Sequence, residues 1–154
     1  MTERSPESDP RILELYKIAV EMADRVSARR STANTFFLTV ETAFVAVLGV
    51  ATPSLQKAPW WTALAVTLAG IILSASWWLQ LRSYRDLNRA KFNVINAVEK
   101  GLPLKVFSDE WVILQEDRVK GWPGRYAELG TIERVIPTVF AFLYVLLFLG
   151  RIIS

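Results

Sequence analysis

One stretch decides the fold: residues 60–100 read WWTALAVTLAGIILSASWWLQLRSYRDLNRAKFNVINAVEK and contain no proline. Residues 60–81 have no charged side chain, whereas residues 82–100 carry seven. The stretch therefore predicts one unbroken helix, roughly 60 Å long at about 1.5 Å per residue. About half of that length matches the hydrocarbon core of a bilayer. We expect residues 60–81 to cross a membrane and residues 82–100 to extend from it as a basic stalk.

Two further apolar segments, residues 33–52 and 135–153, predict membrane helices on either side of this stretch. In the first, Glu41 costs about 2.5–3.5 kcal/mol, but the large apolar residues around it contribute roughly −4 kcal/mol. The last segment is free of charge until Arg151 and is expected to span fully; the alternative is a re-entrant or buried helix. The chain is thus predicted to be an all-α membrane protein with three transmembrane helices.

Prolines and tryptophans mark the ends of these spans. Pro53 and Pro59 are predicted to bracket a short loop between the first and second spans. Pro137 is expected in the first turns of the last span, where proline is tolerated. Pairs of tryptophans near both ends of the second span are typical of the two membrane interfaces: Trp60, Trp61, Trp77 and Trp78.

The chain begins with a predicted disordered tail, residues 1–8. Asp9 and Pro10 form a typical helix start, and residues 9–30 carry apolar side chains at helical spacing. This pattern predicts a cytoplasmic amphipathic helix that packs on the basic stalk. The alternative, a helix lying on the membrane surface, is disfavoured because its polar face carries about as much acid as base.

Residues 82–134 are predicted to form the cytoplasmic stalk and a helical layer. Gly101 and Pro103 end the long helix. A short helix is expected from Asp109 to about Lys120, with Ser108 as its N-cap.

The distribution of basic residues predicts the orientation. The loop between the first two spans contains only Lys57, whereas the other flanks of these spans are rich in arginine. We therefore expect the N-terminus in the cytoplasm and the C-terminus outside. Arg151 is the one basic residue that contradicts this pattern.

Composition disfavours an enzyme. The chain has no cysteine and no histidine, which removes the usual nucleophiles, general bases and transition-metal ligands. No cofactor or metal site is expected. The net charge of +3 is explained by the cytoplasmic face of a membrane protein, so no nucleic-acid partner is predicted.

Several segments together resemble a known family. They are Arg29 to Leu38, Tyr84 to Phe92 with Glu99 and Pro103, Glu110-Trp111, and Arg125-Tyr126. Over residues 12–145 the chain resembles the RipA-type small membrane proteins of bacteria, described as octamers of the cytoplasmic membrane. The resemblance implies a homo-oligomer linked to stress tolerance, with no assigned chemistry. A looser similarity is to the SLATT effectors, which are thought to form pores but lack the third span found here.

Arg30, Asn34 and Glu41 are the intramembrane polar candidates. Their spacings of four and seven place them on one helix face. That face is expected to turn toward an oligomer axis or toward Arg82 and Arg85. Glu41 then either lines a cation path as part of a carboxylate ring or forms a buried polar contact that fixes helix register.

Two further stripes lie on the stalk. The basic stripe consists of Arg82, Arg85, Arg89 and Asn96. It is predicted either to anchor the cytoplasmic face or to bind an anionic lipid or nucleotide. A second stripe is predicted to contact a neighbouring subunit or the N-terminal helix: Tyr84, Asn88, Lys91 and Ile95. Small residues in the second span would permit close helix approach: Ala63, Ala65, Ala69, Gly70, Ser74 and Ala75.

Two functions follow from these features. The first is a non-enzymatic, homo-oligomeric membrane scaffold that supports envelope or stress physiology, together with an unidentified cytoplasmic partner. The second is an ion-conducting pore, or a gated pore-forming effector, lined by the first span. A membrane enzyme is disfavoured by the composition.

Overall fold

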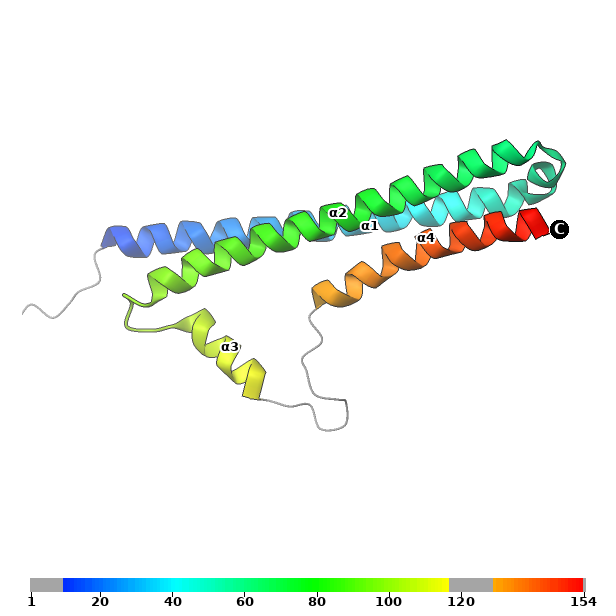
Figure 1. Ribbon diagram of the computed structural model, residues 1–154. Coiled ribbons are helices and arrows are strands. Elements are labelled where there is room, and N and C mark those ends of the chain that lie inside the picture. Colours follow the sequence, from blue (N-terminus) through cyan, green and yellow to red (C-terminus); the bar gives the residue numbers. More distant parts are fainter. Residues whose placement is uncertain (1–9, 117–128, 154) are drawn as a thin grey trace, which may run out of the picture. The chain divides into compact units, whose positions relative to one another are not determined.

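The computed structural model describes residues 10–116 and 129–153, and within these ranges it contains helices and no strand. The helices are α1 (Pro10–Lys57), α2 (Trp60–Glu99), α3 (Val106–Glu116) and α4 (Leu129–Ile153), shown in Figure 1. Three of them, α1, α2 and residues 133–153 of α4, are long and apolar enough to cross a membrane. The predicted all-α class with three candidate spans is therefore confirmed.

Helix α1 joins two segments that the sequence suggested as separate, residues 9–30 and 33–52. Arg29 and Arg30 do not end a helix, because no glycine or proline follows them until Gly49. The threonines of α1 also fit the helix, since Thr35 Oγ1 donates to the Ser31 carbonyl and Thr39 Oγ1 to the Thr35 carbonyl. The amphipathic and apolar segments are therefore one helix of 48 residues.

The loop predicted between Pro53 and Pro59 is much shorter in the structure, so this prediction is wrong. Helix α1 continues through Pro53 to Lys57, and only Ala58 and Pro59 separate it from α2. The fixed φ of proline is compatible with a helix, so Pro53 costs one backbone hydrogen bond without ending α1. The Ala58 amide closes the helix by donating to the Ser54 carbonyl at 3.1 Å.

Helix α2 agrees with the predicted long helix and ends at Glu99, one residue early. Helix α3 starts at Val106, so Ser108 lies inside it and is not its N-cap, which corrects the prediction. Residues 117–120 of the predicted short helix lie outside the described residues, as do residues 1–8.

Helix α4 begins at Leu129, six residues before the predicted span. Hydropathy marks where a membrane span begins, and nothing in residues 129–134 prevents the helix from starting earlier. Pro137 consequently lies inside the helix, where it is buried, and not in its first turns.

The chain divides into two compact units. The charged unit comprises residues 10–28 of α1, residues 84–99 of α2, and α3. The apolar unit comprises residues 29–57 of α1, residues 60–83 of α2, and α4. In Figure 1 the apolar unit is an α1–α2 hairpin with α4 alongside it.

One face of α2 forms the centre of the apolar unit. Its buried residues recur at intervals of three or four, which places them on a single helix face: Thr67, Gly70, Ser74, Trp77 and Leu81.

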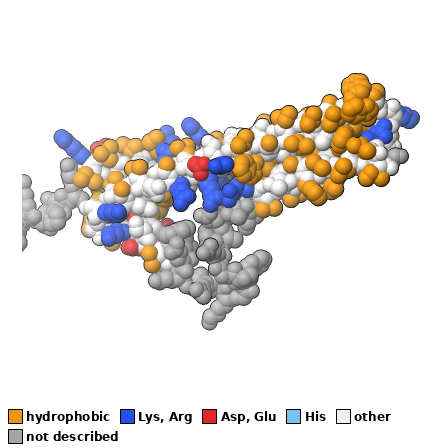
Figure 2. Space-filling view, viewed as in Figure 1, with side chains coloured by type: hydrophobic (Ala, Val, Ile, Leu, Met, Phe, Trp, Pro, Cys, Tyr) orange, Lys and Arg blue, Asp and Glu red, His pale blue; other side chains and the backbone are white. Residues whose placement is uncertain are grey.

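The outer surface of the apolar unit is largely apolar, as Figure 2 shows for one face. Val50 is 85% exposed, Ile72 64% and Phe142 60%, and these residues come from three different helices. A monomeric soluble protein rarely exposes so much apolar surface, so this surface requires lipid or a neighbouring subunit.

Candidate functional site: a buried polar node

Glu41 is the centre of a polar node at the middle of the apolar unit. Its side chain is fully buried, and each carboxylate oxygen accepts one hydrogen bond from a different helix. Ser74 Oγ of α2 donates to Oε1 at 2.7 Å. Tyr144 OH of α4 donates to Oε2 at 2.5 Å. The carboxyl group thus connects α1, α2 and α4 at a single point.

Gly70 makes this geometry possible. A Cβ at position 70 would lie 2.7 Å from three carbons of the Tyr144 ring, which is closer than real Cβ contacts. Because Gly70 has no side chain, the ring packs directly against the α2 backbone, and its hydroxyl reaches Glu41. Ser74 follows one turn later on the same face of α2. Small residues at such positions are typical of close helix packing in membranes.

Asn34 forms a second contact between α1 and α2. Its Oδ1 accepts a hydrogen bond from Trp77 Nε1 at 3.1 Å, and Trp77 is almost completely buried. The indole also stacks on Phe37, with ring centroids 6.0 Å apart, and contacts Phe140 of α4 at 6.2 Å. This cluster explains why Trp77 lies inside the protein, although its sequence position suggested a membrane interface.

Arg30 pairs with Glu133 at the start of α4. Arg30 Nε and Nη2 both donate to Glu133 Oε2, at 2.9 and 2.6 Å. Arg30, Asn34 and Glu41 each have a partner on α2 or α4 of the same chain, and these partners differ from those expected. Glu41 contacts the hydroxyl groups of Ser74 and Tyr144 instead of Arg82 or Arg85, because those arginines lie about two and three turns beyond Ser74 along α2.

Arg151 connects the C-terminal end of α4 to the turn between α1 and α2. Its Nη2 donates to the carbonyl oxygens of Gln56 at 2.9 Å and of Ala58 at 3.3 Å. These carbonyls belong to the last turn of α1 and the residue after it, where a helix lacks internal donors and where a positive charge is favourable. The one basic residue that contradicted the charge pattern thus has a local structural role.

The charged unit has a polar node of its own around Glu99, which is fully buried. The carboxylate accepts hydrogen bonds from Tyr16 OH at 2.8 Å, from the amides of Phe107 and Ser108 at 2.9 and 3.1 Å, and from Ser108 Oγ at 3.0 Å. The two amides are among the unpaired donors in the first turn of α3. The Glu99 side chain, supplied from α2, therefore caps the N-terminal end of α3.

This environment changes two pKa values. Burial raises the pKa of Glu99, but the donors from Phe107, Tyr16 and Ser108 outweigh it, so the net pKa is lowered. Burial, together with the hydrogen bond to Glu99 and its charge, raises the pKa of Tyr16 to about 12. Both shifts favour an ionised Glu99 and a neutral Tyr16 at pH 7.

The stripes predicted on the stalk are distributed over both units. In the apolar unit, the Arg82 guanidinium lies 5.7 Å from the centre of the Trp78 ring. In the charged unit, Arg89 is exposed, whereas Arg85, Tyr84, Asn88, Lys91 and Asn96 are half-buried. The Oδ1 atoms of Asn88 and Asn96 are buried without a hydrogen-bond partner among the described residues. Their assignment to lipid, nucleotide or subunit contacts stays a prediction.

The sequence reasoning identified Glu41 but missed Tyr144, Tyr16 and the capping role of Glu99. A usable signal existed for Tyr144, since it is the only residue with a hydroxyl group between Val139 and Arg151. For Glu99 there was none, because its partners depend on how α3 packs. In the described ranges no three His, Cys, Asp or Glu side chains gather as a metal site would require.

Comparison with known proteins gives one match. Residues 13–153 match the model of the octameric membrane protein family (8xMP). No curated protein and no solved structure matches the chain. The match covers nearly the whole chain and includes both polar nodes.

Proposed function

Because the chain belongs to the octameric membrane protein family and is an oligomeric integral membrane protein, we propose that it serves as a non-catalytic scaffold subunit. In this role it would assemble as a homo-octamer in the bacterial cytoplasmic membrane and support envelope or stress physiology. Its N-terminus would be cytoplasmic, and its charged unit would receive an unidentified cytoplasmic partner.

The observation that carries this proposal is the internal use of Glu41. An ionisable residue inside a membrane span usually marks a substrate or ion path. Here both carboxylate oxygens accept hydrogen bonds within the protomer, and the side chain is fully buried. The group therefore fixes how three helices pack, while the surface presented to neighbours is apolar. Both features suit a structural subunit.

The test combines assembly with flux. Eight copies of the 17.4 kDa chain correspond to about 139 kDa in nanodiscs once lipid is subtracted. For Glu41→Gln we expect weakened assembly and no change in ion flux through liposomes. A native mass of one or two chains for the wild type would overturn the octamer, and an altered ion selectivity in Glu41→Gln would overturn the scaffold.

A second candidate, an ion-conducting pore lined by α1, is favoured by a separate observation. Exposed hydroxyl and small residues recur along α1 at intervals of three and four, so they form one face: Thr35, Thr39, Thr42 and Ala46. Around an oligomer axis this face would give a weakly polar lining. The hydroxyl groups of Thr35, Thr39 and Thr42 also donate to carbonyls of their own helix, so the same face is compatible with lipid.

Cysteine accessibility separates these two readings of the α1 face. The chain has no cysteine, so a single Thr39→Cys substitution gives a reporter without background. A charged, membrane-impermeant thiol reagent should modify Thr39→Cys only if water reaches this face. Val47→Cys is the matched control, because Val47 is 63% exposed on another face of the same helix. Modification of both variants would indicate a loosely packed bundle instead of a pore.

A further inference from the structure

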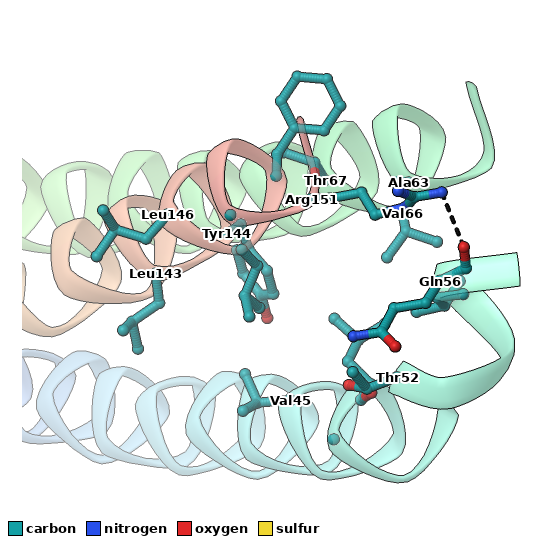
Figure 3. Close-up of a pocket in the computed structure, with 16 residues that line it drawn as sticks. Val45, Thr52, Gln56, Ala63, Val66, Thr67, Leu143, Tyr144, Leu146 and Arg151 are labelled. Atoms are coloured by element: carbon teal, nitrogen blue, oxygen red, sulfur yellow. Dashed lines mark hydrogen bonds between the residues drawn. The ribbon is translucent and has the colours of Figure 1, made fainter. Parts of the chain in front are cut away.

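A cavity of about 750 Å³ lies at the hairpin end of the apolar unit, between α1, α2 and α4. Its volume falls within the range of about 300–1,000 Å³ that is usual for small-molecule sites. Several lining residues are exposed, including Leu146 and Leu147, so the cavity opens on the surface of the unit. Figure 3 shows Val45 of α1 and Tyr144 of α4 facing one another across it.

The lining changes in character along the cavity. Its inner part is formed by aliphatic side chains such as Val45 and Leu143, whereas Thr52, Gln56 and Arg151 line the part next to the hairpin turn. On α4, Arg151 follows Tyr144 by seven positions, which corresponds to about 10 Å of helix. The cavity is therefore amphipathic, with a long apolar part and a polar, positively charged end.

Arg151 supplies the charge at that end. Its Nη2 donates to the carbonyls of Gln56 and Ala58, which leaves the guanidinium with a full positive charge. Its Nε atom is buried and has no hydrogen-bond partner within residues 10–116 and 129–153. A buried donor without an acceptor is costly, and an anionic group beside the guanidinium would offset that cost.

We propose that this cavity binds one phospholipid, with an acyl chain along the aliphatic inner part and the phosphate at Arg151. Three observations favour a lipid over other occupants. The cavity lies within the three candidate membrane spans, its lining is mainly aliphatic, and its charge lies near the ends of two spans, where headgroups are found. The proposal goes beyond the scaffold function and does not depend on it.

Gly49, which lines the cavity, provides a direct test. A Cβ added at Gly49 meets no atom within 4 Å, so Gly49→Leu would fill the cavity without a clash at the backbone. Arg151→Gln removes the charge. Ala43→Leu is the matched control, because Ala43 is exposed on the same helix and does not line the cavity.

The measurement is native mass spectrometry of delipidated protein in a non-ionic detergent, titrated with phosphatidylglycerol. We expect saturation at one lipid per chain for the wild type and for Ala43→Leu. Both Gly49→Leu and Arg151→Gln should weaken binding at least fivefold. Because α1 loses a capping contact in Arg151→Gln, Gly49→Leu keeps the test valid even if that variant is unstable.

Three outcomes would overturn the proposal. Unchanged lipid binding in Gly49→Leu would show that no acyl chain enters the cavity. A loss in Arg151→Gln alone would show that a headgroup binds at the surface only. If Gly49→Leu breaks the oligomer while the wild type binds no lipid, the cavity is filled by a second copy of this chain.

Discussion

Replacing Gly70 with alanine should destabilise the apolar unit by about 1–5 kcal/mol. The added Cβ would lie 2.7 Å from three carbons of the Tyr144 ring. Overpacking of this kind costs about 1–3 kcal/mol. If the ring moves away to relieve the clash, Tyr144 OH leaves Glu41, and a buried acceptor that loses its donor costs about 1–3 kcal/mol more. The higher helix propensity of alanine offsets about 1 kcal/mol of this destabilisation.

The assay is reversible unfolding in bicelles, with Gly49→Ala as the matched control. Gly49 lies in the same unit, and a Cβ there meets no atom within 4 Å, so this change should be neutral or slightly stabilising. The mechanism is tested further by a double-mutant cycle with Tyr144→Ala. Once the ring is absent, Gly70→Ala should cost little, since the clash and the hydrogen bond to Glu41 are both gone.

The reasoning would be refuted if Gly70→Ala were as stable as Gly49→Ala. It would also be refuted if the cost of Gly70→Ala were the same with and without the Tyr144 ring. In that case the cost would arise elsewhere on α2, and the close approach of α4 would not determine the stability of the unit.

Two further predictions concern the charged groups. The folded pKa of Glu99 is lowered, so Glu99 stabilises the charged unit above its unfolded pKa of about 4.5, and this stabilisation is lost as pH falls through the folded value. The folded pKa of Tyr16 is raised, so the stability that Tyr16 contributes is complete below pH 10 and is lost as pH rises through about 12. The hydrogen-exchange protection factors of the Phe107 and Ser108 amides, taken relative to the intrinsic exchange rate at each pH, should therefore fall in acid. Glu99→Gln should remove that acid dependence, and an unchanged dependence would contradict the capping role. Glu133→Gln should destabilise the apolar unit by about 1 kcal/mol, because its ion pair with Arg30 is only partly buried. Salt screens such a pair, so the loss of stability should be smaller at high salt. A loss that does not depend on salt would indicate that Glu133 acts through packing instead of charge.

How much the sequence predicts depends on the range of the interactions involved. The bounds of α2 were predicted within one residue, because a charge-free half and a glycine–proline stop are local signals. Glu41 was identified as a residue that needs partners, since an acid in a span is costly. Those partners, Ser74 and Tyr144, lie 33 and 103 residues away, and no local pattern specifies them.

The incorrect predictions have the same origin. Ser108 has the side chain of an N-cap, and local preference placed the start of the short helix there. The structure instead supplies a carboxylate from Glu99, which lies at the end of the preceding helix and allows α3 to begin at Val106. Likewise, Pro53 indicated a turn by composition, yet the backbone of α1 accommodates it. In both cases the packing of neighbouring elements outweighed the local preference.

The node at Glu41 also has a consequence for biogenesis. Glu41 is synthesised 103 residues before Tyr144, which corresponds to an interval of about 5–20 s at usual elongation rates. During that time the newly inserted α1–α2 hairpin can offer the acid only Ser74, so the nascent protein carries a half-satisfied carboxyl group in the bilayer. Arrival of the last helix completes the pair of donors. Chains truncated before Tyr144 would therefore keep a half-satisfied acid inside the apolar unit.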